Sequence, residues 1–95
     1  MRELYVQSRI RYTLRKMYPG AGIFKLSDYS ISGLPDLLFV YSRKAMFIEV
    51  KTPRGRLSKI QEETINLIRR NGIPVKVARS KDEAITFVKS EIERR

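Results

Sequence analysis

Residues 33–51 read GLPDLLFVYSRKAMFIEVK, and the rest of the chain is interpreted around this stretch. Two apolar runs flank a short polar turn, a pattern that predicts a β-hairpin. Asp36 opens the first arm, and Glu49 and Lys51 end the second. Because side chains alternate between the two faces of a strand, Glu49 and Lys51 point the same way. The hairpin therefore carries two carboxylates and one amine at one end, a set that can hold a divalent metal and activate a water molecule.

The register of the hairpin decides whether Asp36 joins the other two side chains. A two-residue turn at 43–44 would place Asp36 opposite Lys51, whereas a three-residue turn would place it opposite Val50. Only an odd-numbered partner puts Asp36 on the face of Glu49, so we expect the two-residue register or a bulge. The alternative, purely structural explanation is a salt bridge between Lys51 and either carboxylate, since burying an unpaired carboxylate is costly.

The amino-acid composition narrows the chemistry that such a site can perform. The chain of 95 residues contains no cysteine and no histidine. This excludes disulfides, thiolate chemistry and Ser-His-Asp catalysis, and it leaves a zinc site without its usual ligands. Any metal must be held by oxygen atoms, which favours Mg²⁺ or Mn²⁺. The length and the 42% of hydrophobic residues predict one globular domain over residues 1–95.

The charge of the chain indicates a polyanionic partner. Twenty Lys and Arg residues face 10 acidic residues, which gives a net charge of +10 and a pI near 10.3. Nucleic acid is the first expectation and an anionic membrane surface the second, whereas a merely soluble surface is usually more balanced. No apolar run approaches the ~18 residues that span a membrane, and no signal peptide is visible. We therefore expect a cytoplasmic protein.

An amphipathic helix is predicted over residues 2–18, before Pro19-Gly20 ends it. Glu3 heads its inward stripe, where it also meets the positive end of the helix dipole, a sufficient structural reason for an acid there. The members of the stripe are Glu3, Gln7, Ile10, Leu14 and Met17. A short strand is expected over residues 22–26.

A polar loop over residues 27–34 leads into the hairpin. Its Gly33 permits a close backbone approach, and Pro35 holds the entry to the strand rigid, although an ordinary turn would explain both residues equally well. Tyr29 and Ile31 in this loop are candidates for contact with DNA or with a partner subunit.

Two serines predict the helix starts in the second half of the chain. Ser58 with Gln61 forms a capping-box pattern before a helix that runs to about Asn71, and Ser80 with Glu83 repeats it before a helix over residues 81–93. A last strand is expected at 73–78. Gln61 either caps its helix or reaches inward to the metal site, and we expect that one side chain cannot do both.

The expected order is αβββαβα, an α/β fold with a small mixed β-sheet flanked by helices. With Pro35-Asp36 before Glu49-Val50-Lys51, the chain resembles the PD-(D/E)xK nuclease superfamily and its restriction-endonuclease-like core. Within the superfamily it is similar to a stand-alone VRR-NUC domain. The features that carry this resemblance are Gly33-x-Pro35-Asp36, the spacing to Glu49-Val50-Lys51, Gln61 in the next helix, and the early helix with Glu3 and Gln7.

The resemblance implies a role for each residue of the site. Asp36 and Glu49, with the backbone carbonyl of Val50, would ligate Mg²⁺ or Mn²⁺, and Glu3 would complete the site directly or through water. Lys51 would orient or polarise the attacking water, supported by Gln61. Because the cation relieves repulsion between ionised carboxylates, the metal-free protein should be the less stable form.

The resemblance also implies a substrate and an assembly. Small stand-alone members resemble Holliday-junction resolvases and act as homodimers, which suggests a structure-specific endonuclease for branched DNA in DNA repair. Phosphate contacts are expected from seven basic residues, namely Arg54, Arg56, Lys59, Arg9, Arg11, Arg15 and Lys25. The alternatives are a non-catalytic basic DNA-binding module with a relic nuclease site and, on charge alone, an RNA-binding protein.

Overall fold

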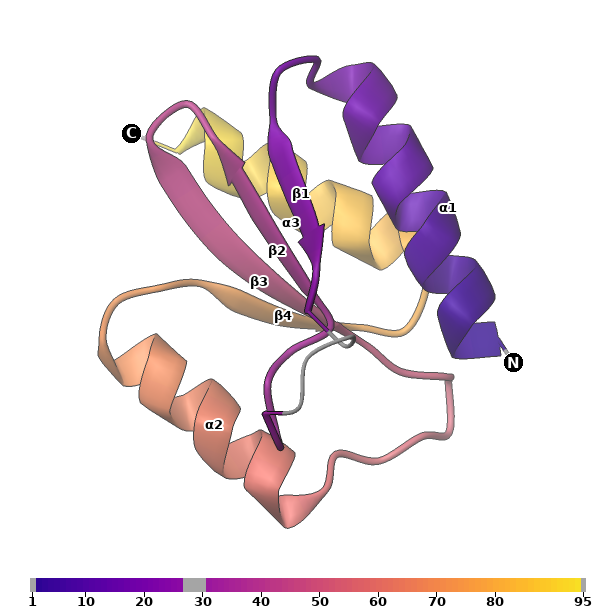
Figure 1. The fold of residues 1–95 in the computed structure, drawn as a ribbon, viewed down its shortest axis with the longest axis vertical. Coiled ribbons are helices and arrows are strands. Elements are labelled where there is room, and N and C mark those ends of the chain that lie inside the picture. The colour runs from indigo at the N-terminus through magenta and orange to yellow at the C-terminus, as the bar shows by residue number, and fades with distance from the viewer. Residues whose placement is uncertain (1, 27–30, 95) are drawn as a thin grey trace.

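The protein folds as a four-stranded sheet with three helices (Figure 1). The computed structural model describes residues 2–26 and 31–94. Within these residues the elements are α1 (Arg2–Met17), β1 (Gly22–Lys25), β2 (Leu37–Tyr41), β3 (Lys44–Val50), α2 (Lys59–Arg70), β4 (Val75–Ala78) and α3 (Lys81–Glu93). The αβββαβα order and the mixed α/β class are confirmed. Their bounds differ from the expected ones by no more than two residues at any end.

The sheet has the strand order β1-β2-β3-β4, so the chain builds it from one edge to the other. The first three strands are antiparallel, whereas β4 pairs with β3 in parallel. The α2 helix provides the crossover that a parallel pair requires. It lies next to β4, at the end of the sheet where β3 finishes (Figure 1). The end of β3 therefore lies close to α2.

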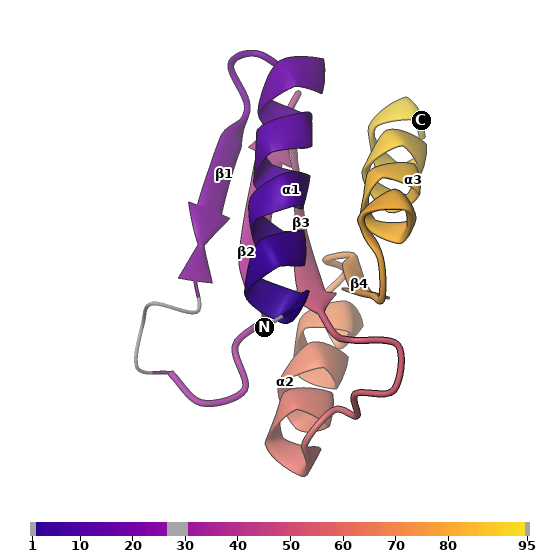
Figure 2. The same ribbon diagram turned by 90° about the vertical axis from the view of Figure 1, so that its right-hand side faces the viewer.

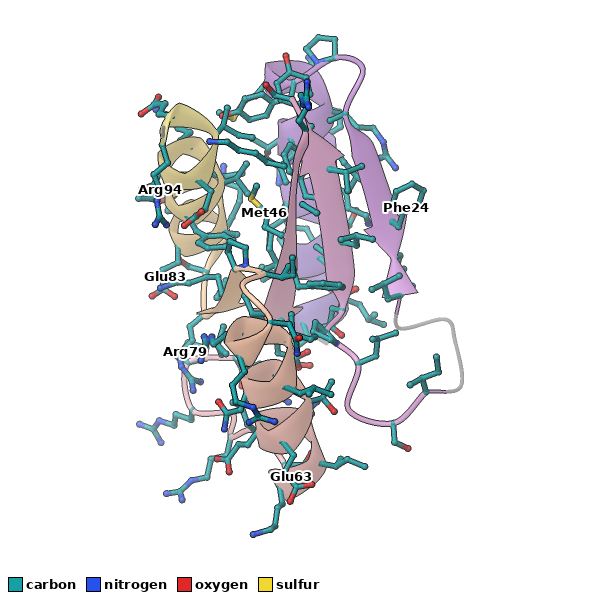
Figure 3. All side chains as sticks on the ribbon, turned by 90° about the vertical axis from the view of Figure 1, so that its left-hand side faces the viewer. Phe24, Met46, Glu63, Arg79, Glu83 and Arg94 are labelled. Carbon is teal, nitrogen blue, oxygen red and sulfur yellow. The ribbon has the colours of Figure 1, made fainter. Side chains whose placement is uncertain are left out.

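The core lies between one face of the sheet and two helices. Figure 2 shows α1 and α3 side by side on the same face of the sheet. Alternation along β2 buries Leu37 and Phe39 on this face, and both side chains are at most 1% exposed. The main contacts come from Ile10 and Leu14 of α1, Met46 and Ile48 of β3, and Ala84 and Val88 of α3. The opposite face is less well covered, since Phe24 on β1 is 51% exposed and lies on the far side of the molecule from α3 (Figure 3).

The inward stripe of α1 is shorter than expected. Gln7, Ile10 and Leu14 are buried, but Met17 in the last turn is 38% exposed. The ring of Tyr18 packs edge-on against Phe39 instead, with 5.6 Å between ring centroids. The residue that follows the helix therefore fills the position for which the helical period predicted Met17.

Both predicted hairpin registers are wrong. The turn consists of Ser42 and Arg43, whose φ angles are +54° and +66°, and Tyr41 pairs with Lys44. Two left-handed residues form the type I′ turn that matches the twist of a hairpin, usually built with Asn or Gly. Neither residue signals this turn in the sequence, because Ser and Arg are not among the residues that favour it. The last pair at the other end is Leu37 with Ile48, so Asp36 follows at the level of Glu49.

The two helix caps are similar in sequence but differ in structure. At α2 the capping box is complete, since Ser58 Oγ accepts from Gln61 N and Gln61 Oε1 accepts from Ser58 N at 2.9 Å. At α3, Ser80 Oγ accepts from the backbone N–H of Glu83 as expected. The Glu83 carboxylate, however, accepts from the N–H of Arg79 at 2.8 Å and not from that of Ser80. The second box is therefore shifted by one residue.

Candidate active site

Asp36 stands at the mouth of β2 and is fixed by the neighbouring strand. Its Oδ2 accepts a hydrogen bond from the backbone N–H of Val50 at 2.8 Å. This bond links the loop before β2 to the last residue of β3. Because Glu49 precedes Val50 directly and is level with Asp36 in the register, the two carboxylates belong to one site.

The loop that carries Asp36 is fitted against α2 through Gly33. Its φ is +83°, a value that favours glycine. A Cβ at this position would lie 2.6 Å from Thr64 Oγ1 and 2.7 Å from the carbonyl oxygen of Ile60, both of which belong to α2. The close approach that the sequence suggested at Gly33 is therefore made to a helix. Pro35 is fully buried behind it.

Glu49 is the buried charge of the site, with 2% of the residue exposed. Its Oε2 lies 3.6 Å from Lys51 Nζ and accepts a hydrogen bond from Gln61 Nε2 at 3.2 Å. Its other oxygen, Oε1, is buried and has no hydrogen-bond partner within residues 2–26 and 31–94. A buried carboxylate oxygen without a donor is costly, so this oxygen suits a bound cation. The salt bridge with Lys51 exists, but it uses only one of the two oxygens.

Gln61 performs both of the roles that we expected to exclude each other. Its amide oxygen closes the capping box at Ser58, while its amide nitrogen donates to Glu49. The expectation was wrong because an amide carries an acceptor and a donor on different atoms, so one side chain can serve two partners at once. The start of α2 is thereby tied to the buried carboxylate.

The surroundings raise the pKa of both carboxyl groups. Burial is the main cause at Asp36, partly offset by the hydrogen bond from Val50. At Glu49, burial and then the charge of Asp36 raise the pKa to about 7, while Lys51 opposes the shift. Glu3 raises the pKa of both groups further, so it lies within electrostatic reach of the pair. Two carboxyl groups that disfavour each other's ionised form make a site that a cation would stabilise.

Glu3 does not make this pair into a cluster of three. No group of three acidic side chains close enough to hold a metal together occurs in the described part of the chain. Glu3 is half-buried in the first turn of α1, at the same end of the fold. Both expected modes for Glu3, direct completion of the site and completion through water, stay predictions.

A basic segment leaves the site after Lys51. Arg54, Arg56 and Lys59 are exposed along it, as expected for phosphate contacts. Arg79, which the sequence analysis missed, holds this segment in place: its Nη1 donates to the carbonyl oxygens of Thr52 at 2.8 Å and of Gly55 at 2.6 Å. Figure 3 shows Arg79 near the start of α3. Its only signal was a basic residue at the end of a strand parallel to β3.

The other expected phosphate contacts lie on α1 and at the end of β1. Arg9 and Arg15 are exposed on α1, whereas Arg11 is half-buried and its Nε is buried without a hydrogen-bond partner in the residues described. Lys25 lies at the end of β1 and lowers the pKa of Asp36, so it stands near the site. In the loop over residues 27–34, Tyr29 falls outside the described residues and Ile31 is 64% exposed.

Across residues 2–26 and 31–94, no helix is long and apolar enough to cross a membrane.

The fold and the site together define a nuclease-type α/β domain, with an acidic pair and a lysine at the end of a central strand. Comparison with known proteins agrees. The VRR-NUC domain family matches residues 8–82, and the chain belongs to this family. A solved structure described as a VRR-NUC domain is 25% identical, with a TM-score of 0.69 over 87% of this chain and 94% of that one. A search of curated proteins gave no match.

Proposed function

We propose that this protein is a divalent-metal-dependent endodeoxyribonuclease that hydrolyses phosphodiester bonds in branched DNA. The observation that supports the proposal most directly is Glu49, a buried carboxylate beside Asp36 and Lys51 with one oxygen that has no partner among the residues described. The basic segment with Arg54 and Arg56 supplies positive charge next to it. A carboxylate pair flanked by cations suits a substrate whose phosphate approaches a bound metal.

The donor set fits Mg²⁺ or Mn²⁺. Asp36, Glu49 and the carbonyl oxygen of Val50 would hold the ion, and Glu3 would act through water, all with oxygen ligands that these ions prefer. When bound, such an ion polarises a phosphoryl oxygen and lowers the pKa of a coordinated water.

The chain's own residues have separate tasks in this proposal. The backbone N–H of Val50 orients Asp36, and the amide of Gln61 orients Glu49, so both carboxylates are positioned before substrate arrives. The Lys51 ammonium, held beside Glu49, orients the attacking water and stabilises negative charge that develops on the phosphate. Arg54, Arg56 and Lys59 hold neighbouring phosphates without reading base sequence, so the enzyme selects DNA by shape.

The substrate and the assembly belong to the same proposal. Each 95-residue subunit carries one site, and paired cuts across a four-way junction need two sites related by symmetry. We therefore propose a homodimer that cuts branched DNA such as Holliday junctions in DNA repair. Light scattering should give a mass of twice 11.1 kDa, and a monomer at the concentration of full activity would contradict the dimer.

The decisive experiment compares cleavage of four-way junctions, flaps and linear duplex in Mg²⁺, Mn²⁺ or EDTA. The variant is Asp36→Asn, which removes the charge and keeps an acceptor for Val50 N–H. The matched control is Asp82→Asn, the same change at an exposed position of α3. We expect metal-dependent cleavage by the wild type and by the control alone. The enzyme proposal would be refuted if the wild type and Asp36→Asn both lacked activity, or if both had the same activity without metal.

A binding measurement completes the test. Mg²⁺ at 100 times its dissociation constant should raise the free energy of unfolding by about 2.7 kcal/mol in the wild type and much less in Asp36→Asn. DNA binding that is sensitive to salt and survives this substitution, with no stabilisation by metal, would instead identify the chain as a non-catalytic DNA-binding module.

A further inference from the structure

The outward side of α1 carries two exposed tyrosines between basic residues. Tyr5 is 61% exposed and Tyr12 is 53% exposed. At 100° per residue, Tyr5, Arg9, Tyr12 and Lys16 fall within about 60° of one another, on the side opposite the buried stripe of α1. We call these four residues the tyrosine stripe. Nothing in the proposed chemistry of the site uses either tyrosine.

The two cations of the tyrosine stripe lie against the same aromatic ring. Arg9 Cζ is 5.8 Å and Lys16 Nζ is 5.3 Å from the centroid of the Tyr12 ring. Such pairs stabilise an exposed helix slightly, which is the simplest explanation for them. They also place two positive charges over the ring of Tyr12, a residue that is 53% exposed. This alternation of aromatic rings and cations is the arrangement by which proteins hold a single strand, with bases on the rings and phosphates on the cations.

We propose that the tyrosine stripe binds an unpaired strand of the DNA that the site acts on. This inference rests on the proposed function and specifies its substrate: branched DNA with an unpaired segment next to the cleaved phosphate. Duplex DNA cannot use the tyrosines in this way, because its base faces are already stacked. A second copy of the chain is a poorer occupant of this face, since a symmetric contact would place Arg9 and Lys16 close to their own copies.

The first turn of α1, from which the tyrosine stripe starts, lies next to the site. The helix begins beside the basic segment that leaves β3 and runs along the sheet to its other end (Figure 2). A hollow of about 220 Å³ lies between its first turns and the site, and Glu3, Val6 and Lys51 are among the residues that line it. At 100° per residue, Tyr5 lies about 160° around α1 from Glu3, so a strand on the stripe has to cross the first turn of the helix to reach the site. The stripe continues for about 16 Å to Lys16, at 1.5 Å per residue.

The test compares single-stranded with double-stranded DNA of equal length by fluorescence anisotropy in EDTA, where no cleavage can occur. The double variant Tyr5→Ala/Tyr12→Ala should weaken single-strand binding by at least about 5-fold, the lower limit for one lost stacking contact. Duplex binding should change by less than about 2-fold, because phosphate contacts remain. Tyr5→Phe/Tyr12→Phe should bind as the wild type does, since stacking needs the ring and not the hydroxyl.

The control is Leu67→Ala, which removes another exposed apolar side chain, 52% exposed, from α2. It should leave both affinities unchanged. Equal losses for both DNA forms, no loss for either, or a change of oligomeric state in the Tyr→Ala variant would each overturn the inference. Junction cleavage is measured separately. If the wild type does not cut junctions but the Tyr→Ala variant selectively loses single-strand binding, the proposed function is refuted and the inference about the tyrosine stripe stands.

Discussion

The two ends of the β2–β3 hairpin differ in how well their charged side chains are paired. At the turn, Lys44 Nζ donates to the carbonyl oxygens of Glu91 at 2.7 Å and Ile92 at 3.2 Å, and also to that of Arg94. It thereby caps the C-terminus of α3 with a favourable charge. At the open end, Glu49 is buried, one of its oxygens has no hydrogen-bond partner in the described part of the chain, and its pKa is raised to about 7.

The difference shows which end of the hairpin lowers the free energy of unfolding of this small domain. A lysine with several acceptors is satisfied, so the turn end contributes to folding. At the open end, Glu49 Oε1 has no hydrogen-bond partner among the described residues and both carboxyl groups have raised pKa values, so this end costs stability that a bound cation would restore. We therefore expect substitutions at one end to change stability and substitutions at the other to change activity.

The largest effect should follow from neutralising the open end. Glu49→Gln should lower Mg²⁺-dependent cleavage by about 10³-fold, equivalent to about 4 kcal/mol, because the proposed metal site would lose one of its ligands. In EDTA at pH 8 the same variant should be at least as stable as the wild type, since it removes a buried charge. Single-turnover cleavage and urea unfolding measure the two effects. A loss of stability that parallels the loss of activity would break the comparison.

The next effect should come from the turn end. Lys44→Met keeps the length and the apolar stem of the side chain but removes the donor to the end of α3. It should lower the free energy of unfolding by about 1–3 kcal/mol, because carbonyl groups lose a charged partner. Cleavage per folded molecule should stay unchanged. If cleavage falls at a temperature where circular dichroism shows a folded protein, the two ends are not independent.

Ser58 and Gln61 separate helix capping from support of the site. Ser58→Ala should cost about 1 kcal/mol of stability through the lost cap and leave the contact between Gln61 and Glu49 in place. Gln61→Ala should cost a similar amount and also lower cleavage by about 10-fold, as substitutions behind a metal ligand do. Comparing the two variants by unfolding and by kcat isolates the role of the amide. Equal kcat values in both variants would show that Gln61 only caps α2 and does not support the site.

The most gradual effect is a dependence of stability on pH. Burial raises the pKa of Glu49 from 4.5 to about 7, so between these values the folded protein binds more protons than the unfolded chain. The free energy of unfolding of the metal-free protein should therefore fall as pH rises through this range, and the contribution of Glu49 should level off above it. Urea midpoints in EDTA at several pH values would show this slope. It should be smaller in Glu49→Gln, and an identical slope in that variant would assign the effect elsewhere.

Local signals were sufficient for the elements, but not for their contacts. Ser58 and Ser80 marked the helix starts because a cap satisfies backbone groups within three residues of itself. The hairpin register was predicted incorrectly, since Ser42 and Arg43 adopt left-handed geometry without the residues that usually announce it. Arg79 was overlooked because its partners, Thr52 and Gly55, lie more than 20 residues away in the sequence.

The sequence by itself determined the chemistry that is available: no histidine or cysteine, a paired acid and lysine motif, and a surplus of 10 positive charges. It also determined the order of helices and strands, because hydrophobic period and caps act locally. Only the tertiary structure decided that Asp36 stands level with Glu49, that Glu49 is buried, and that Gln61 reaches it from α2. Burial and proximity arise from segments that meet in space, and these two quantities set the pKa values of the site.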